Sequence, residues 1–313
     1  FDLTELADET RHPYRIQCEQ YKLARRLTQR LSEMDNAEVL FSHRLVHLEQ
    51  DDKGVTVHAE TPLHLLRIRA DFLIGADGAN SLVRKWLGTG FEGFTYPEKF
   101  LTMSTDWPIE NHFEDLAWVN YVSDPEEWCV LLRVPTLWRV LVPASEETPD
   151  EVLVSDEKKN DVFQRLVGDG PGVVTNHRTV YRVHQRVAER FVHDRVFLIG
   201  DAAHLNNPLG GFGMNSGIHD AMNLCDKLFE AMAEPARREE LLALFERQRH
   251  TVTRSFIQQQ SIRNKQDMEL GGAEAERRRA DEMRRQCEDP DLRRQFLLRQ
   301  SMIQSIRDAA AIS

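Results

Sequence analysis

The fold of this chain is decided by the stretch Arg195-Val-Phe-Leu-Ile-Gly-Asp-Ala-Ala-His-Leu-Asn-Asn-Pro-Leu-Gly-Gly-Phe-Gly-Met-Asn215. It begins with a short apolar run, Val196 to Ile199, of the kind that forms a strand buried on both faces of a parallel sheet. Asp201 follows at the carboxyl end of that strand, where open α/β sheets bind their ligands. A carboxylate in that place can accept hydrogen bonds from ligand hydroxyl groups. The stretch therefore predicts an α/β fold with a ligand at this turn.

A glycine-rich segment and a helix follow the acidic turn. After Pro208, three glycines allow the backbone to approach a flat ligand more closely than a Cβ atom would permit; they are Gly210, Gly211 and Gly213. Five apolar residues then form one stripe at helical spacing, namely Ile218, Met222, Cys225, Phe229 and Met232. The helix therefore begins near Gly213, and its free N–H groups point back to the glycine turn. Such a helix end attracts a negatively charged ligand group.

A second strand-and-turn motif lies upstream, in Asp71-Phe-Leu-Ile-Gly-Ala-Asp-Gly-Ala-Asn-Ser-Leu-Val-Arg84. It predicts a short buried strand, a tight turn at Asp77-Gly78, and a helix that carries Ser81 near its start and Arg84 in its first turns. Taken alone, an ordinary strand-to-helix turn explains the motif as well as a ligand site does. Two such turns, each at the end of a buried strand, are more specific, and we expect them to meet in space.

With these two motifs, residues 1–232 resemble the flavin-dependent aromatic hydroxylases, the single-component FAD monooxygenases related to 4-hydroxybenzoate hydroxylase. The resemblance implies a discontinuous FAD-binding Rossmann-like domain with an inserted antiparallel-sheet substrate domain. It also implies that NAD(P)H reduces the FAD and that O2 adds to it as a C4a-hydroperoxide, whose terminal oxygen passes to a phenolic ring. The implied cofactor is FAD, and the implied partners are NAD(P)H, O2 and a small aromatic substrate.

The resemblance also implies roles for individual residues. Asp77, Gly78 and Arg84 resemble the motif between the FAD pyrophosphate and the nicotinamide cofactor, and Gly200-Asp201 resembles the motif that holds the ribityl chain. In the loop that resembles the flavin-ring loop, the expected catalytic positions are Pro208 and Gly210, with Pro208 beside the oxygen-reacting face. The remaining expected cofactor contacts are Gln17, Gly211, Gly213, Met214 and Asn215, the last two through their backbone at the pyrimidine edge. For Gln17, a polar residue at a helix start is an equally good explanation.

The chain departs from this family in one large respect. The family opens with a βαβ unit carrying G-x-G-x-x-G, which holds the adenine-side phosphates, and no such unit is present here. The literal match at Gly88-Thr-Gly-Phe-Glu-Gly93 follows an expected helix and leads into a sheet, so we interpret it as a coincidence. Because Phe1 is not an initiator methionine, we expect the chain to begin partway through a longer one.

Two smaller features concern the flavin loop. Leu209 and Phe212 are apolar where the family often carries polar groups, and this leaves open what polarises the reacting oxygen. We interpret His204 as a turn residue packed behind the loop rather than as a catalytic group.

Composition excludes several other classes of protein. The chain has 313 residues, 41% of them hydrophobic, which suits about two domains, and its net charge of -11 argues against binding nucleic acid. The four cysteines lie far apart, which predicts a reduced, cytoplasmic protein. No apolar run reaches the roughly 18 residues of a transmembrane segment. No metal-ligand spacing, Ser/His/Asp set or phosphate-binding G-x-x-x-x-G-K-[ST] motif is present.

We predict five segments along the chain. Residues 1–15 belong to the substrate domain, 16–90 and 191–235 to the FAD-binding domain, 91–190 to the substrate domain, and 236–313 to a C-terminal helical region. Within them we expect helices over 17–34, 81–87 and 155–167, a hairpin of strands 39–48 and 55–59 with a third strand at 63–69, and further strands at 118–122, 128–134, 138–142 and 179–187.

The C-terminal region predicts helices interrupted at Gly271-Gly272 and restarted at Asp289-Pro290. The last helix is expected to carry an apolar stripe of Leu292, Phe296, Ile303 and Ile306. This region could serve either to cover the active site or to build a homodimer.

Two rival functions remain open at this point. One is a flavin oxidoreductase of the same fold that does not hydroxylate, such as a halogenase or a reductase, although a halogenase-type Trp-x-Trp-x-x-Pro element is missing. The other is a binding module without turnover that lacks the βαβ unit.

Overall fold

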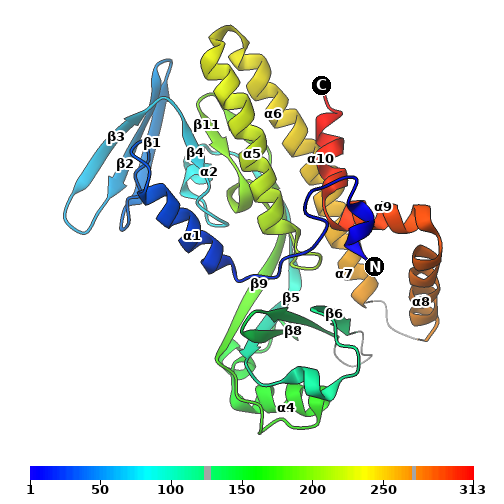
Figure 1. Cartoon of the computed structure of the whole chain (residues 1–313). Coiled ribbons are helices and arrows are strands. Elements are labelled where there is room, and N and C mark those ends of the chain that lie inside the picture. The colour runs from blue at the N-terminus through cyan, green and yellow to red at the C-terminus, as the bar shows by residue number, and fades with distance from the viewer. Residues whose placement is uncertain (123–127, 270–272) are drawn as a thin grey trace. The chain divides into compact units, whose positions relative to one another are not determined.

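The computed structural model describes residues 1–122, 128–269 and 273–313, which form two compact units (Figure 1). The first unit comprises residues 1–39, 96–183 and 266–285, and the second comprises 40–95, 184–265 and 286–313. The mixed α/β fold expected from the sequence is confirmed. The five predicted domain segments divide the chain differently from these units, and they stay a prediction.

The second unit opens with an antiparallel meander. Its strands are β1 (Arg44–Asp51), β2 (Gly54–Glu60) and β3 (Leu65–Ala70), paired in that order. Asp51 accepts hydrogen bonds from the backbone N–H groups of Lys53 at 2.8 Å and Gly54 at 3.1 Å, which closes the turn between β1 and β2. The predicted hairpin and third strand are therefore confirmed.

A small sheet in the second unit carries the two turns singled out in the sequence. β11 (Val196–Leu198) pairs in parallel with β4 (Leu73–Gly75), and β10 (Val192–His193) lies on the other side of β11. All three residues of β11 are fully buried, as expected for a strand covered on both faces. The short helices α2 (Leu82–Trp86) and η3 (Gly200–Ala202) follow β4 and β11, and β12 (His204–Leu205) comes next.

Helices complete the second unit. α5 (Phe212–Ala233) and α6 (Arg238–Val252) lie side by side, joined through η4 (Pro235–Arg237) (Figure 1). A π-helical segment, η5 (Thr253–Gln258), continues α6 into α7 (Gln259–Glu269). Near the C-terminus, α9 (Pro290–Gln300) and α10 (Ile303–Ala310) also belong to this unit.

The apolar stripe predicted on α5 is real as a pattern, but most of it is exposed. Ile218, Met222 and Met232 are exposed, and Phe229 is 71% exposed. The helix instead buries Phe212, Ser216, Asp220, Leu224 and Ala231. Two of these are polar, and they can be buried because partners on other elements satisfy their hydrogen bonds.

The prediction of one continuous last helix was wrong. Asp289 caps α9, accepting from the backbone N–H groups of Asp291 and Leu292, as expected. The helix then stops, because Met302 takes a left-handed backbone conformation with φ +61°, which an α-helix cannot accommodate. The predicted interruption at Gly271-Gly272 lies outside the described residues.

The first unit is built on an antiparallel sheet. The strands of this sheet run in the order β12-β9-β5-β8-β7-β6. Besides β12, their bounds are His177–Ala188 (β9), Phe91–Thr105 (β5), Leu137–Ser145 (β8), Cys129–Val134 (β7) and Val119–Val122 (β6). β5 and β9 each continue along the chain into the second unit. The helices of the first unit include η1 (Leu3–Leu6), α1 (Gln20–Ser32), η2 (Ile109–His112), α3 (Asp150–Leu153), α4 (Asp156–Val167) and most of α8 (Ala273–Glu288).

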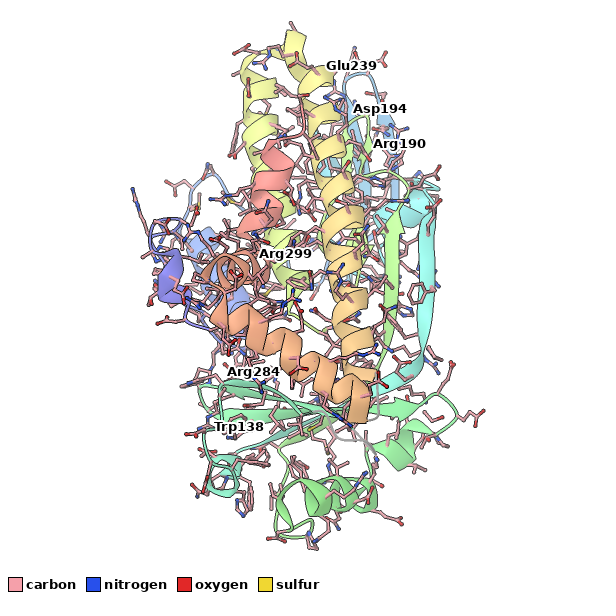
Figure 2. All side chains as sticks on the ribbon, turned by 90° about the vertical axis from the view of Figure 1, so that its right-hand side faces the viewer. Trp138, Arg190, Asp194, Glu239, Arg284 and Arg299 are labelled. Carbon is pink, nitrogen blue, oxygen red and sulfur yellow. The ribbon has the colours of Figure 1, made fainter. Side chains whose placement is uncertain are left out.

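The tryptophans of this sheet have different environments. Trp128 and Trp138 are buried, whereas Trp118 is exposed. The indole N–H of Trp138, labelled in Figure 2, donates to Glu110 Oε2 at 2.5 Å. Trp138 also belongs to the apolar core that β5, β7, β8 and α4 share. Trp138 therefore serves the packing of the sheet.

None of the helices formed by residues 1–122, 128–269 and 273–313 is both long enough and apolar enough to span a bilayer.

Candidate functional site

The two turns that the sequence predicted to meet do lie next to each other. β4 and β11 are parallel, with Leu198 opposite Gly75, so both strands end at the same edge. The N–H of Ile199 donates to the carbonyl of Gly75 at 3.1 Å, just before the two chains diverge. This edge is where α/β sheets bind ligands.

Arg84 joins the two turns directly. Its Nη1 donates to the carbonyl of Ala202, 118 residues away, at 2.7 Å, and its Nη2 donates to the carbonyl of Ala79 at 2.7 Å. The guanidinium stacks on Phe91, 3.7 Å from the ring centroid, and only 6% of the residue is exposed. Burial lowers the pKa of Arg84, which the nearby charge of Asp77 opposes. Through these two hydrogen bonds, Arg84 holds the two turns together, and we refer to this pair of bonds as the Arg84 clamp.

The carboxylate of Asp77 caps the helix that follows it. It accepts from the Ser81 hydroxyl at 2.5 Å and from the backbone N–H groups of Leu82 and Val83 at 2.7 and 3.1 Å. Gly78 has φ +79°, a conformation that suits glycine. The Asp77-Gly78 turn is thus rigid, and both carboxylate oxygens already hold protein donors.

Asp201 presents the opposite situation. It is exposed, and within the described part of the chain no group donates a hydrogen bond to its carboxylate. Desolvation by surrounding protein atoms raises the pKa of Asp201, an effect that His204 opposes. The preceding residue, Gly200, has φ +55°, and a Cβ atom on Gly217 of α5 would lie 3.0 Å from the Cα of Gly200. The turn therefore packs closely on α5 and leaves Asp201 with free acceptor oxygens.

The glycine-rich loop needs its glycines for conformation and for space. Gly210 has φ +100°, and a Cβ atom there would lie 2.4 Å from the ring of Phe212. Gly211 has φ +70° and forms the N-cap of α5, and no side chain among the described residues caps that helix end. Pro208, Met214 and Asn215 are exposed around it. The loop leaves an uncapped helix N-terminus, which is suited to a negatively charged ligand group.

Several residues that support this loop were missed by sequence reasoning. Asn207 is fully buried: its N–H donates to Gln185 Oε1 at 3.1 Å and its Nδ2 to the carbonyl of Ser261 at 2.8 Å. Its Oδ1 accepts from the N–H of Leu209 at 3.1 Å. Asn264 of α7 donates to the carbonyl of Leu209 at 3.3 Å. Since these partners come from β9 and α7, no local pattern in the loop could have indicated them.

The other predicted positions have clear structural settings. Gln17 is half-buried, two residues before the N-cap of α1, in the first unit, and its proposed contact with the ribityl chain stays a prediction. The interpretation of the Gly88 to Gly93 match as a coincidence is confirmed, because it follows α2 and runs into β5. Gly93 is required for another reason: a Cβ atom there would lie 1.9 Å from the carbonyl oxygen of Gln185.

These features fit a flavin dinucleotide in the second unit. Asp201 has acceptor oxygens for hydroxyl groups of a ligand. The glycines after Pro208 allow a ligand to approach the backbone closely, and the N-terminus of α5 can stabilise a negatively charged ligand group. The parallel pair β4 and β11, with both turns at one edge, defines the class of α/β dinucleotide-binding folds.

Comparison with known proteins makes the assignment specific. The chain belongs to the FAD binding domain family, whose profile matches residues 2–260. A para-nitrophenol 4-monooxygenase of Pseudomonas sp. (strain WBC-3) is 33% identical over 77% of this chain and 60% of that protein. A 6-hydroxy-3-succinoylpyridine 3-monooxygenase of Pseudomonas putida (strain DSM 28022 / S16) is 32% identical over 82% of this chain and 64% of that protein. The chain thus spans about three fifths of the length of these curated relatives.

Solved structures agree with the family. The p-nitrophenol 4-monooxygenase PnpA of Pseudomonas putida DLL-E4 has a TM-score of 0.85 at 29% identity, over 95% of this chain and 75% of that chain. The flavin-dependent monooxygenase PieE, solved with FAD and substrate, has a TM-score of 0.71 at 26% identity, over 94% of this chain and 52% of that chain. FAD is therefore the cofactor of this family, as the sequence predicted.

Proposed function

We propose that this chain is part of an FAD-dependent monooxygenase that hydroxylates a small phenolic compound with NAD(P)H and O2. The observation that carries the proposal is the exposed carboxylate of Asp201, which accepts no hydrogen bond from the described residues. It follows a turn that packs on α5, in a chain of the FAD binding domain family. The names of the relatives, monooxygenases of nitrophenol and of a hydroxypyridine, support the reaction type and the substrate class.

In this proposal the chain's own residues bind and orient the cofactor. Asp201 accepts hydrogen bonds from ribityl hydroxyl groups, and the N-terminus of α5, at Met214 and Asn215, stabilises negative charge at the pyrimidine edge. Pro208 and Gly210 bring backbone close to the reacting face. Asp77, Gly78 and Arg84 fix the adjoining turn, and Gln17 approaches the ribityl chain. When bound, FAD supplies the electron transfer between NAD(P)H and O2.

We further propose a cytoplasmic location for the protein. The wide spacing of the four cysteines supports it, since secreted proteins of small size use cysteines in closely organised frameworks. A homodimer is part of the same proposal, in which the C-terminal helices serve either to build the dimer or to cover the active site.

A single preparation of the full-length protein tests the reaction. We expect a yellow protein that oxidises NAD(P)H faster when 4-nitrophenol or a related phenol is added, with one hydroxylated product per NAD(P)H consumed. Stimulated oxidation with hydrogen peroxide as the sole product would favour the non-hydroxylating oxidoreductase. A colourless protein that takes up no FAD would favour the binding module.

A further inference from the structure

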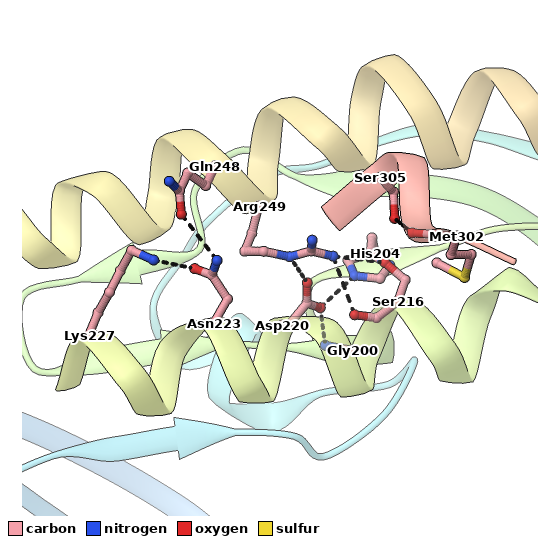
Figure 3. A network of polar contacts seen from close by, with 10 residues as sticks. All are labelled: Gly200, His204, Ser216, Asp220, Asn223, Lys227, Gln248, Arg249, Met302 and Ser305. Carbon is pink, nitrogen blue, oxygen red and sulfur yellow. Dashed lines mark hydrogen bonds and ion pairs between the residues drawn. The ribbon is translucent and has the colours of Figure 1, made fainter. Parts of the chain in front are cut away.

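A buried polar network lies directly behind the turn that carries Asp201 (Figure 3). Its centre is Asp220 of α5, which is 0% exposed. Asp220 Oδ2 accepts from the backbone N–H of Gly200 at 3.0 Å and from His204 Nε2 at 2.7 Å. Asp220 Oδ1 accepts from Nε of Arg249 at 2.7 Å. Because a carboxylate can only accept, His204 Nε2 is the donor in this pair.

The network ties three segments of the second unit to Asp220 of α5. Gly200 belongs to the acidic turn, His204 to β12, and Arg249 to α6. Arg249 also donates from Nη2 to the hydroxyl of Ser216 at 3.2 Å, one helical turn before Asp220 on α5. Through Asp220, the acidic turn is therefore fixed to the same helix whose N-terminus closes the glycine loop.

The charge balance of the network indicates why Asp220 is needed there. Desolvation alone raises the pKa of Asp220, but His204 and Arg249 outweigh it and lower the pKa to about 2. The carboxylate is thus ionised, and Arg249, itself almost fully buried, neutralises it. A buried pair of this kind adds little net stability compared with well-packed apolar residues, so its value lies in the geometry that it fixes.

The packing of the turn on the helix leaves little freedom around this contact. Gly200 and Gly217 approach so closely that a Cβ atom on Gly217 would lie 3.0 Å from the Cα of Gly200. The N–H of Gly200 then points at Asp220, one helical turn along α5. Since Asp201 is the next residue, this hydrogen bond and the glycine contact fix the backbone that leads into it.

We propose that Asp220 is a positioning residue of the cofactor site, which holds Asp201 in register with the N-terminus of α5. This inference rests on the proposed function only for the identity of the ligand. Misplacing a binding group by about 1 Å can cost on the order of 100-fold in function. Asp220→Asn removes the charge and turns one acceptor into a donor, so it must lose at least one of its three partners.

The test compares Asp220→Asn with Glu246→Gln as the matched control. Glu246, three residues before Arg249 on α6, also accepts backbone N–H groups, from Phe191 at 2.9 Å and Val192 at 2.6 Å, and is not bonded to Gly200 or Asp220. We expect Asp220→Asn to raise the Kd for FAD about 10- to 100-fold and to change the visible absorption spectrum of the bound flavin. Glu246→Gln should leave the Kd for FAD and the flavin absorption spectrum unchanged. The melting temperatures of both variants are measured, so that a general loss of stability can be told apart from a local effect on the site.

Amide hydrogen exchange of the protein without FAD gives an independent readout. Peptides covering residues 196–206 should exchange faster in Asp220→Asn but not in Glu246→Gln. If Asp220→Asn fails to fold, Arg249→Lys, which keeps the positive charge but loses the bond to Ser216, should show the same pattern more weakly.

Two results would overturn the inference: unchanged exchange in residues 196–206, or an equal loss of FAD affinity in the control. If the unmutated protein binds no FAD, the proposed function fails, and hydrogen exchange still decides whether Asp220 positions the turn.

Discussion

Substitution of Asp201 by alanine tests the cofactor site most directly. The carboxylate is exposed and receives no hydrogen bond from the described residues, so both oxygens are available to a ligand. A hydrogen bond to a charged group contributes about 1.5 to 3 kcal/mol. Losing one should therefore raise the Kd for FAD by about 10-fold to 150-fold. Asp201→Asn keeps a neutral acceptor, so its Kd for FAD should lie between those of the unmutated protein and Asp201→Ala.

The same substitution should not destabilise the protein without FAD. Desolvation raises the pKa of Asp201 in the folded state, so folding disfavours its charged form, and this cost appears as the pH rises through the folded-state pKa. At neutral pH, Asp201→Ala should therefore leave the melting temperature of the apoprotein unchanged or slightly higher. Weaker FAD binding without loss of stability separates a ligand contact from a structural role.

The assay is a titration of apoprotein with FAD, followed by the change in flavin fluorescence, alongside thermal unfolding without FAD. Asp194→Asn is the matched control, because Asp194 is an exposed aspartate at the opposite end of β11, labelled in Figure 2. It has φ +54°, which asparagine tolerates. An unchanged FAD affinity in Asp201→Ala, or the same loss in Asp194→Asn, would refute the assignment of Asp201 to the ribityl chain.

Three further predictions concern the surrounding structure. Arg84→Ala should lower both FAD affinity and stability, the latter by about 1.5 to 3 kcal/mol in denaturant unfolding, because it removes the clamp on the carbonyls of Ala79 and Ala202; a variant with normal stability would contradict the clamp. Gly210→Ala should distort the glycine loop, because the residue has φ +100° and the new Cβ atom would collide with the Phe212 ring. A normal absorption spectrum of bound flavin in Gly210→Ala would contradict this distortion. The pKa of Asp220 is lowered from 3.8 to about 2. The stability that depends on its charge should therefore be complete above pH 3.8 and be lost as the pH falls toward 2. In acid unfolding, Asp220→Asn should lack this pH-dependent loss of stability between pH 3.8 and 2.

Local sequence patterns determined the elements that carry the site. The apolar run Val196 to Ile199 and the turn residues Gly78 and Gly200 act through short-range rules of burial and backbone conformation, so β11 and both turns were predicted where they occur. The hairpin of β1 and β2 and the cap at Asp289 follow from the same kind of local signal.

Only the tertiary structure decided which side chains hold these elements together. The place of Arg84 near a cofactor stays a prediction, and the structure adds a hydrogen bond to the carbonyl of Ala202, 118 residues away. Asp220 lies off the apolar stripe of α5, yet it is fully buried, and its charged partner Arg249 lies 29 residues further on. A buried polar group is stable only with its partner, and the partner becomes a neighbour through folding, which periodicity along one helix cannot record.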